Sequence, residues 1–206
     1  MNIVFEVTLT AAVFLLIYVL FVKMAKPIYN LDEWSGRLWQ WAENNGVSRR
    51  KLPRYEENLI ELSELDISYR GLEYIPAELC NVTSLTKLIA SGNKLSSLPK
   101  EISGLTNLTE LDFTENLFTD IPLGLFELKK LQKLSFWDNK LTTIPKEIGN
   151  LTNLKELDLS NNRLSLLPNE ITKLKLAAFS IYGNPNLVLT KEQEEWTKSI
   201  EEFDKN

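Results

Sequence analysis

The sequence predicts a solenoid of the α/β class, in which copies of one short unit stack on each other and a helical cap closes each end. Three regularities support this fold class. Prolines recur every 23 residues, at Pro76, Pro99, Pro122, Pro145 and Pro168. Asparagines keep the same 23-residue interval, at Asn93, Asn116, Asn139 and Asn162, and leucines recur around them in fixed positions. Self-similarity at a fixed period of this length is typical of repeat architectures.

Six units can be aligned between residues 62 and 189. They begin at Leu62, Leu85, Leu108, Leu131, Leu154 and, after a shortened join, Leu176. The second unit reads LTKLIASGNKLSSLPKEISGLTN and the fifth reads LKELDLSNNRLSLLPNEITKLK. One unit cannot bury its own apolar side chains, whereas stacked units bury them against each other in a continuous core. We therefore expect stability to come from contacts between neighbouring units.

The pattern LxxLxLxxNxLxxLPxxIxxLxx resembles that of the leucine-rich repeat family, in the 23-residue, proline-containing form found in cytoplasmic Ras-suppressor-like and many bacterial members. This resemblance covers residues 62 to about 189. It implies that each unit forms a short parallel strand on the concave side of an arc, followed by a looser convex return. The residues agree, because Leu157 and Leu159 alternate with their neighbours at the period of a strand.

The recurring asparagines predict a tight turn after each strand. Such a turn inside a stacked coil leaves backbone N–H and C=O groups that neither water nor the sheet can reach. An amide carries both a donor and an acceptor, so a column of asparagines can satisfy these groups. The first unit has Arg70 at this position, a departure that suits a terminal repeat. Proline suits the convex return, where its fixed φ and missing donor do no harm.

Residues 1–26 predict a membrane anchor. The run from Val7 to Val22 carries no charge, and its 16 residues span about 24 Å as a helix, or about 30 Å when extended back to Ile3. Residues 3–22 are therefore the predicted contact with the membrane. A cleaved signal peptide and a buried helix are the alternatives. A signal peptide has a basic start and small residues before its cleavage site, where this chain has Lys23.

The charges around this segment predict its orientation. No Lys or Arg precedes the apolar run, whereas Lys23, Lys26 and Arg37 follow it closely. The bulk of a single-pass protein then lies on the cytoplasmic side of the membrane. The single cysteine, Cys80, agrees with this side, because a reducing compartment needs no disulfides. We expect Cys80 itself to be a small buried residue.

The segments on either side of the repeats predict the two caps. Residues 27–61 predict a helical N-terminal cap with Asn30 as its N-cap and Gly46 near its end, and with one apolar face made by Trp34, Leu38 and Trp41. The alternative use of this face is an aromatic belt or a contact with a partner helix. Residues 190–206 predict a C-terminal capping helix that starts at Thr190 and buries Trp196, Ile200 and Phe203.

Composition argues against several classes of function. The net charge of -5 disfavours nucleic acid as a partner, because phosphates are bound by clustered Lys and Arg. The chain has no histidine and one cysteine, which removes the commonest general base, the commonest metal ligand and any cysteine zinc site. There is no phosphate-binding loop. We therefore expect no cofactor, no metal, no catalytic residues and no enzymatic activity.

The strand register predicts which side chains point outward onto the concave face. Four outward positions recur in each of the six units, and of these 24 residues eight are acidic and two are basic. We expect a negative potential on this face. A solvated polar sheet face is the simpler interpretation. The departures from the repeat are more informative, since Trp137 and Tyr182 occupy a position that elsewhere holds Ser or Thr.

These observations predict a non-enzymatic protein-binding module, a membrane-anchored adaptor or scaffold that presents an acidic face with aromatic anchors to a protein partner. The candidate partner-binding residues are Tyr69, Ile89, Asp112, Glu115, Trp137, Asp138, Asp158 and Tyr182. An extracytoplasmic recognition protein for peptide or glycan is the alternative. Sequons at Asn81, Asn107 and Asn150 would suit it, but they recur as part of the repeat and carry little weight. No motif names the partner.

Overall fold

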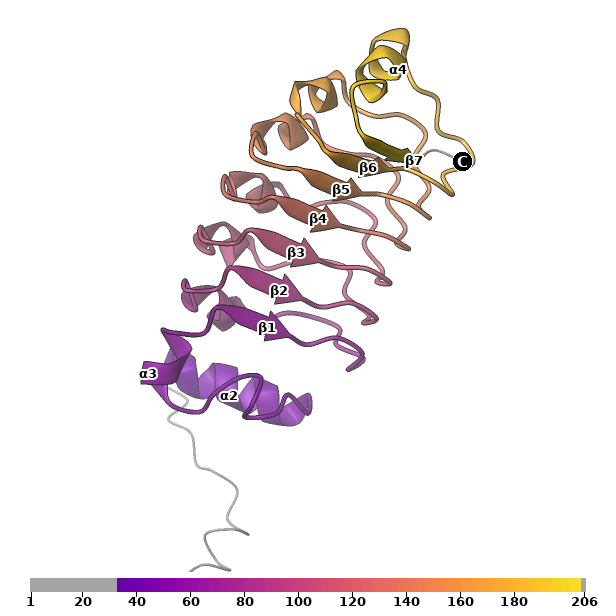
Figure 1. The fold of residues 1–206 in the computed structure, drawn as a ribbon. Coiled ribbons are helices and arrows are strands. Elements are labelled where there is room, and N and C mark those ends of the chain that lie inside the picture. Colours follow the sequence, from indigo (N-terminus) through magenta and orange to yellow (C-terminus); the bar gives the residue numbers. More distant parts are fainter. Residues whose placement is uncertain (1–32, 205–206) are drawn as a thin grey trace, which may run out of the picture. The chain divides into compact units, whose positions relative to one another are not determined.

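The computed structural model describes residues 33–204 of the chain, in which seven parallel strands form one sheet in chain order (Figure 1). The strands are β1 (Glu64–Asp66), β2 (Lys87–Ile89), β3 (Glu110–Asp112), β4 (Lys133–Ser135), β5 (Glu156–Asp158), β6 (Ala178–Ser180) and β7 (Glu202–Asp204). Equivalent residues of successive units pair directly, as in Leu88 with Leu111 and Leu111 with Leu134. The predicted parallel-strand solenoid is confirmed.

A row of short 3₁₀ helices lies on the other side of the units (Figure 1). These are η1 (Ala77–Asn81), η2 (Lys100–Gly104), η3 (Leu123–Glu127), η4 (Lys146–Asn150) and η5 (Asn169–Lys173). Each begins directly after one of the recurring prolines. Proline fits this N-cap position, because it fixes φ and has no N–H to leave unsatisfied. The proline period therefore marks the convex return.

The asparagine column ties each unit to the one before it. The Asn139 Nδ2 donates to the carbonyl oxygens of Phe136 and Trp137 in its own unit, and to that of Phe113 in the preceding unit at 2.9 Å. Its Oδ1 accepts from the N–H of Phe118, also in the preceding unit, at 3.0 Å. Asn93, Asn116, Asn162 and Asn184 make equivalent contacts.

The core between the sheet and the 3₁₀ helices consists mainly of leucine and isoleucine, with an aromatic cluster at its centre. The rings of Phe113, Phe118 and Phe136 are fully buried, and their centroids lie 5.2 to 5.4 Å apart. Phe113 and Phe118 belong to the third unit and Phe136 to the fourth. The cluster therefore holds two neighbouring units together. Cys80 is buried as expected, and burial raises the pKa of its thiol to about 12.

The N-terminal cap contains helix α2 (Trp34–Asn44) and the short helix α3 (Glu56–Leu59). Leu38 and Trp41 are buried in the core, so this face of α2 acts as a cap. The N-cap of α2 is Glu33 and not Asn30, which was a wrong expectation. The helix starts where packing fixes it, because the hydroxyl of Ser35 in its first turn is buried and donates to Glu56 of α3.

Arg70 takes the position of the asparagine in the first unit, where the asparagine column ends. Its guanidinium donates to the carbonyl oxygen of Gly46, just after α2. Its own N–H donates to Asn93 Oδ1 at 3.0 Å, so the tight turn is kept. Within residues 33–204 no unit precedes this one, so an asparagine here would have no earlier turn to bind. Arginine instead reaches the cap.

The C-terminal cap begins as predicted, with Thr190 and Gln193 forming a reciprocal capping box. Gln193 is fully buried, and its Nε2 donates to the carbonyl oxygen of Leu167 at 3.0 Å. The indole of Trp196 donates to the carbonyl oxygen of Leu174 at 3.0 Å. These two side chains therefore satisfy carbonyl groups at the end of the fifth unit. Within the described residues no 3₁₀ helix follows η5 to cover these groups.

The predicted capping helix over residues 190–206 is too long. Helix α4 spans only Lys191–Thr197. Glu202–Asp204 forms strand β7, which pairs with β6. Phe203 lies on this strand and stacks on Phe179 with ring centroids 5.7 Å apart. The open edge of β6 decides this outcome, because its backbone groups need partners that a continued helix cannot supply.

The predicted membrane anchor, residues 1–26 with its contact over 3–22, lies outside the described residues. Within residues 33–204, none of the helices has the length and apolar character needed to cross a bilayer.

Candidate binding face

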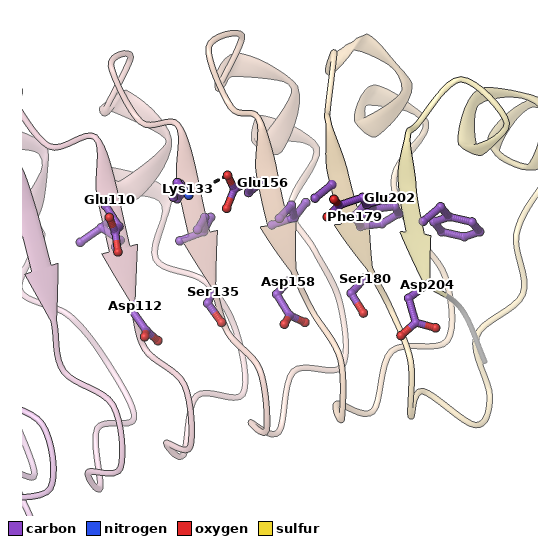
Figure 2. Close-up of a pocket in the computed structure, with 15 residues that line it drawn as sticks. Glu110, Asp112, Lys133, Ser135, Glu156, Asp158, Phe179, Ser180, Glu202 and Asp204 are labelled. Carbon is purple, nitrogen blue, oxygen red and sulfur yellow. Dashed lines mark ion pairs between the residues drawn. The ribbon is translucent and has the colours of Figure 1, made fainter.

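The outward face of strands β3 to β7 is hollowed into a groove of about 570 Å³ (Figure 2). Six carboxylates and one ammonium group line it: Glu110, Asp112, Glu156, Asp158, Glu202, Asp204 and Lys133. We call this face the concave face. The side chains stand in rows that cross the strands, because parallel strands in direct register place equivalent residues side by side. Two rows line the groove, and two more follow beyond the ends of the strands.

Ion pairs between neighbouring strands neutralise two of the four glutamates in the first row. It consists of Glu64, Lys87, Glu110, Lys133, Glu156, Ala178 and Glu202. The Nζ of Lys87 lies 2.7 Å from Glu110, and that of Lys133 lies 2.7 Å from Glu156. Hydrogen bonds to these glutamates raise the pKa of both lysines. Both lysines remain charged, and each cancels one carboxylate.

The second row keeps its negative charge over most of its length. It consists of Asp66, Ile89, Asp112, Ser135, Asp158, Ser180 and Asp204. The Oδ1 of Asp112 accepts from the N–H of Thr114 at 2.8 Å, and that of Asp158 accepts from Ser160 at 2.9 Å. These aspartates therefore help to end their strands. This hydrogen bond uses one oxygen of each carboxylate and leaves the other oxygen for contacts in the groove.

Ile89 breaks the second row, and a buried hydroxyl beside the break has no partner. An isoleucine offers no acceptor to the N–H of Ser91, which an aspartate would bind. The Ser91 side chain is only 7% exposed, and its Oγ has no hydrogen-bond partner in the structure. Buried polar groups are normally satisfied. The repeat has thus lost a hydrogen bond here and gained an apolar side chain on its outward face.

The third row holds Trp137 among small hydroxyl residues. It consists of Ser68, Ser91, Thr114, Trp137, Ser160 and Tyr182. The hydroxyl of Thr114 lies 2.9 Å from that of Ser135. We expected Trp137 to be exposed, and the structure shows it half-buried. The small neighbours Thr114 and Ser160 leave room for the ring against the sheet. Tyr182 is 48% exposed.

The fourth row is a line of left-handed backbone conformations. It consists of Tyr69, Gly92, Glu115, Asp138, Asn161 and Gly183, whose φ values lie between 52° and 69°. This conformation is uncommon for residues other than Gly, Asn and Asp. The repeat therefore fixes where Glu115 and Asp138 lie, whatever they bind. Tyr69 is 71% exposed, and its ring lies so close to Gly92 that a Cβ there would be 2.2 Å from it.

The groove brings together only some of the predicted partner-binding residues. Asp112 and Asp158 line it. The other six lie around it: Ile89 in the second row on β2, Trp137 and Tyr182 in the third row, and Tyr69, Glu115 and Asp138 in the fourth. Sequence reasoning missed Glu202 and Asp204, because it placed them in a helix. The triplet EFD at residues 202–204 repeats the ELD of β1, β3 and β5, and this signal could have revealed them.

Lys51 neutralises the N-terminal end of the second row, and this contact predicts a pH dependence. Its Nζ lies 2.6 Å from the Oδ2 of Asp66. The hydrogen bond from Lys51, followed by that from the N–H of Ser68, lowers the pKa of Asp66 from 3.8 to about 2. A carboxyl group with a lowered folded pKa stabilises the fold above its unfolded pKa, and this stabilisation disappears as pH falls through the folded value.

We therefore expect the urea midpoint to fall between about pH 5 and about pH 2, and to fall less in a Lys51→Met variant. A Lys94→Met variant is the control, since Lys94 forms no ion pair within residues 33–204. Identical pH profiles for Lys51→Met and the unmodified protein would contradict the assignment.

Within the described residues no group of three or more acidic, cysteine or histidine side chains is arranged to hold a metal ion. The groove offers carboxylates and hydroxyls on a fixed sheet. Such a surface can bind cations and hydrogen-bond donors.

Comparison with known families shows to which family the chain belongs. The family model for a leucine-rich repeat region matches residues 45–159, more than half of the chain. The chain belongs to the leucine-rich repeat family. A second model, for the single leucine-rich repeat, matches residues 153–174. No curated protein matches the sequence significantly.

Solved structures of leucine-rich repeat proteins resemble this chain. A leucine-rich repeat protein from Leptospira interrogans is 35% identical, with a TM-score of 0.63, over 74% of this chain and 45% of its own. This chain thus spans less than half of that protein. The ectodomain of the receptor kinase SOBIR1 from Arabidopsis thaliana is 29% identical, with a TM-score of 0.53, over 62% of this chain and 74% of its own.

Proposed function

We propose that this leucine-rich repeat protein is a non-enzymatic binding module that holds a protein partner on its concave face. The groove over β3 to β7 carries the proposal, because it gathers six carboxylates against one lysine on a rigid sheet. Trp137 supports it, since the repeat places Ser or Thr at this position in four of the six units. Aromatic residues surrounded by charges are typical of binding hot spots.

The finer proposal is a membrane-anchored adaptor or scaffold on the cytoplasmic side. It rests on the apolar run at residues 3–22 and on Lys23, Lys26 and Arg37 behind it. A reporter fused to the C-terminus of the full chain tests the orientation. Activity of a reporter that works only in the cytoplasm supports the adaptor.

The second candidate is an extracytoplasmic recognition protein for peptide or glycan. The structural similarity to a receptor kinase ectodomain favours it. The same reporter separates the two candidates, because this one requires the C-terminus on the outer side. Glycosylation at Asn81, an exposed sequon residue, would then also be expected in a host that modifies sequons.

Replacing Trp137 by serine, the residue common in its row, is the test of the binding face. We expect partner binding to weaken at least tenfold, because truncating a central aromatic anchor costs about 2 kcal/mol or more of binding free energy. The free energy of unfolding should fall by only about 1 to 2 kcal/mol, since the ring is half-buried and serine already fits this row.

The measurement is co-purification of partners from membranes with the full chain, together with urea unfolding of each variant. Leu166→Ala is the matched control, because Leu166 is 62% exposed and lies off the concave face, next to the return of the fifth unit. If Trp137→Ser retains every partner that the unmodified chain retains, the concave face is not the binding surface.

A further inference from the structure

We propose that the groove binds a partner segment in the polyproline II conformation that carries an arginine or lysine at every third residue. This inference rests on the proposed function and adds the chemistry and shape of the partner. It follows from the charge that remains unpaired in the groove, from the spacing of that charge, and from the aromatic and hydroxyl side chains beside it.

Most of the unpaired charge in the groove lies in the second row, and Glu202 adds one unpaired carboxylate in the first. Lysines cancel two of the carboxylates in the first row, and Lys51 cancels Asp66. Asp112, Asp158 and Asp204 contact no cationic side chain within the described residues. Figure 2 shows these three carboxylates along one line, with Ser135 and Ser180 between them. A partner that crosses the strands therefore meets alternating carboxylates and hydroxyls.

The spacing of the carboxylates selects the conformation of the partner. Asp112, Asp158 and Asp204 belong to β3, β5 and β7, and neighbouring strands lie about 4.8 Å apart, so successive carboxylates are about 9.6 Å apart. A polyproline II segment repeats its side-chain direction every three residues, which is about 9.3 Å. A helix presents residues i and i+7 about 10.5 Å apart. Residues i and i+2 of a strand are about 6.6 Å apart.

Over the length of the groove, the repeat distance of polyproline II matches the spacing of all three carboxylates best. Across the two intervals from Asp112 to Asp204, polyproline II deviates by roughly 0.6 Å and a helix by roughly 1.8 Å. Alternate residues of a strand reach the two outer carboxylates, with three steps of about 6.6 Å against about 19.2 Å, but no alternate residue falls at the middle carboxylate. Side-chain tips on a concave surface also converge slightly, which moves the required spacing further from that of a helix.

Two further observations also suit such a partner. Trp137 stands on the same outward face as Ser135, two residues further along the chain, and aromatic surfaces bind both proline rings and guanidinium groups. A polyproline II segment makes no internal hydrogen bonds, so its carbonyl groups need donors. The hydroxyls of Ser135 and Ser180, which line the groove, can supply them.

The test compares two peptides with the same composition and charge. The first is four repeats of Arg-Pro-Pro, and the second has its four arginines adjacent and its eight prolines together. Binding of each labelled peptide to the full chain is measured by fluorescence anisotropy at about 0.15 M salt, where distant charges are screened. We expect the periodic peptide to bind at least tenfold more tightly.

Asp158→Asn is the diagnostic variant. Asparagine keeps an acceptor for the N–H of Ser160, so it removes the charge and preserves the end of the strand. We expect it to weaken binding of the periodic peptide about tenfold and to leave that of the clustered peptide nearly unchanged. Asp120→Asn is the control, because Asp120 is exposed and lies off the concave face. It should change neither affinity.

Equal affinities for the two peptides would overturn the inference, because charge alone would then explain binding. Failure of both peptides to bind would also overturn it. In either case the proposed function is judged separately, by whether Trp137→Ser loses the partners that co-purify with the full chain.

Discussion

Replacing Phe136 by alanine is expected to lower the free energy of unfolding by about 4 kcal/mol, the typical cost of removing a buried phenylalanine. The ring is fully buried and lies 5.4 Å from the ring of Phe113 and 5.2 Å from that of Phe118, measured between centroids. Deleting it leaves a cavity between the third and fourth units. Stacked units depend on their nearest-neighbour contacts, so the loss falls on the interface that joins the two halves of the solenoid.

Urea unfolding of the full chain, followed by circular dichroism, measures this effect. We expect the transition to shift and also to broaden, because two groups of units can then unfold separately. Leu166→Ala is the control, since an exposed leucine contributes little. A loss below about 1 kcal/mol for Phe136→Ala would mean that the aromatic cluster does not hold the units together.

Phe136 and Trp137 are neighbours in sequence, and the contrast between them tests the strand register. The register predicts that Phe136 points into the core and Trp137 onto the concave face. The first variant should therefore lower stability by more than Trp137→Ser does, and only the second should alter partner binding. A reversal of these two effects would mean that the register is shifted by one residue.

The repeat made most of the fold predictable from the sequence. A fixed interval of 23 residues places equivalent residues in register, so one unit determines the strand, turn and return of the others. Asn139 and Pro145 are examples, because each plays the same part as its counterparts in neighbouring units. Prediction was least successful at the ends, where the interval changes and the environment differs from that inside the stack.

The C-terminal end shows why the pattern failed there. Trp196, Ile200 and Phe203 follow a helical spacing, and Glu202, Phe203 and Asp204 also follow the spacing of a strand. Local patterns do not decide between the two. The open edge of β6 does, and it becomes apparent only when the stack is assembled. The groove changed accordingly, because β7 supplies two of its six carboxylates.

The acidic composition of the concave face was predictable from the sequence, but the pairing of its charges was not. Counting residues gives an acidic face, yet the structure separates a first row in which lysines pair with glutamates from a second row in which Asp112, Asp158 and Asp204 are unpaired. The pairing depends on side chains of adjacent strands meeting at 2.7 Å, which a count does not reveal. The sequence likewise did not reveal that Trp137 is half-buried.

Replacing Asn139 by alanine is expected to lower the free energy of unfolding by about 3 kcal/mol, because it leaves several buried backbone groups without partners. The amide donates to three carbonyl oxygens, including that of Phe113 at 2.9 Å, and accepts from the N–H of Phe118 at 3.0 Å. Alanine satisfies none of them, and water cannot reach a side-chain position that is only 7% exposed. The cost is therefore the desolvation of these backbone groups, with only a small loss of apolar contact.

Asn153→Ala is the matched control, because Asn153 is an exposed asparagine whose Nδ2 also bridges two units, donating to the carbonyl oxygen of Lys129 at 2.7 Å. Water can replace that single bond, so we expect a loss of about 0.5 kcal/mol or less. Urea unfolding of both variants measures the difference. Equal losses would mean that bridging two units matters and burial does not. A larger loss for Asn139→Ala would show that the column stabilises the solenoid because it lies where water cannot reach.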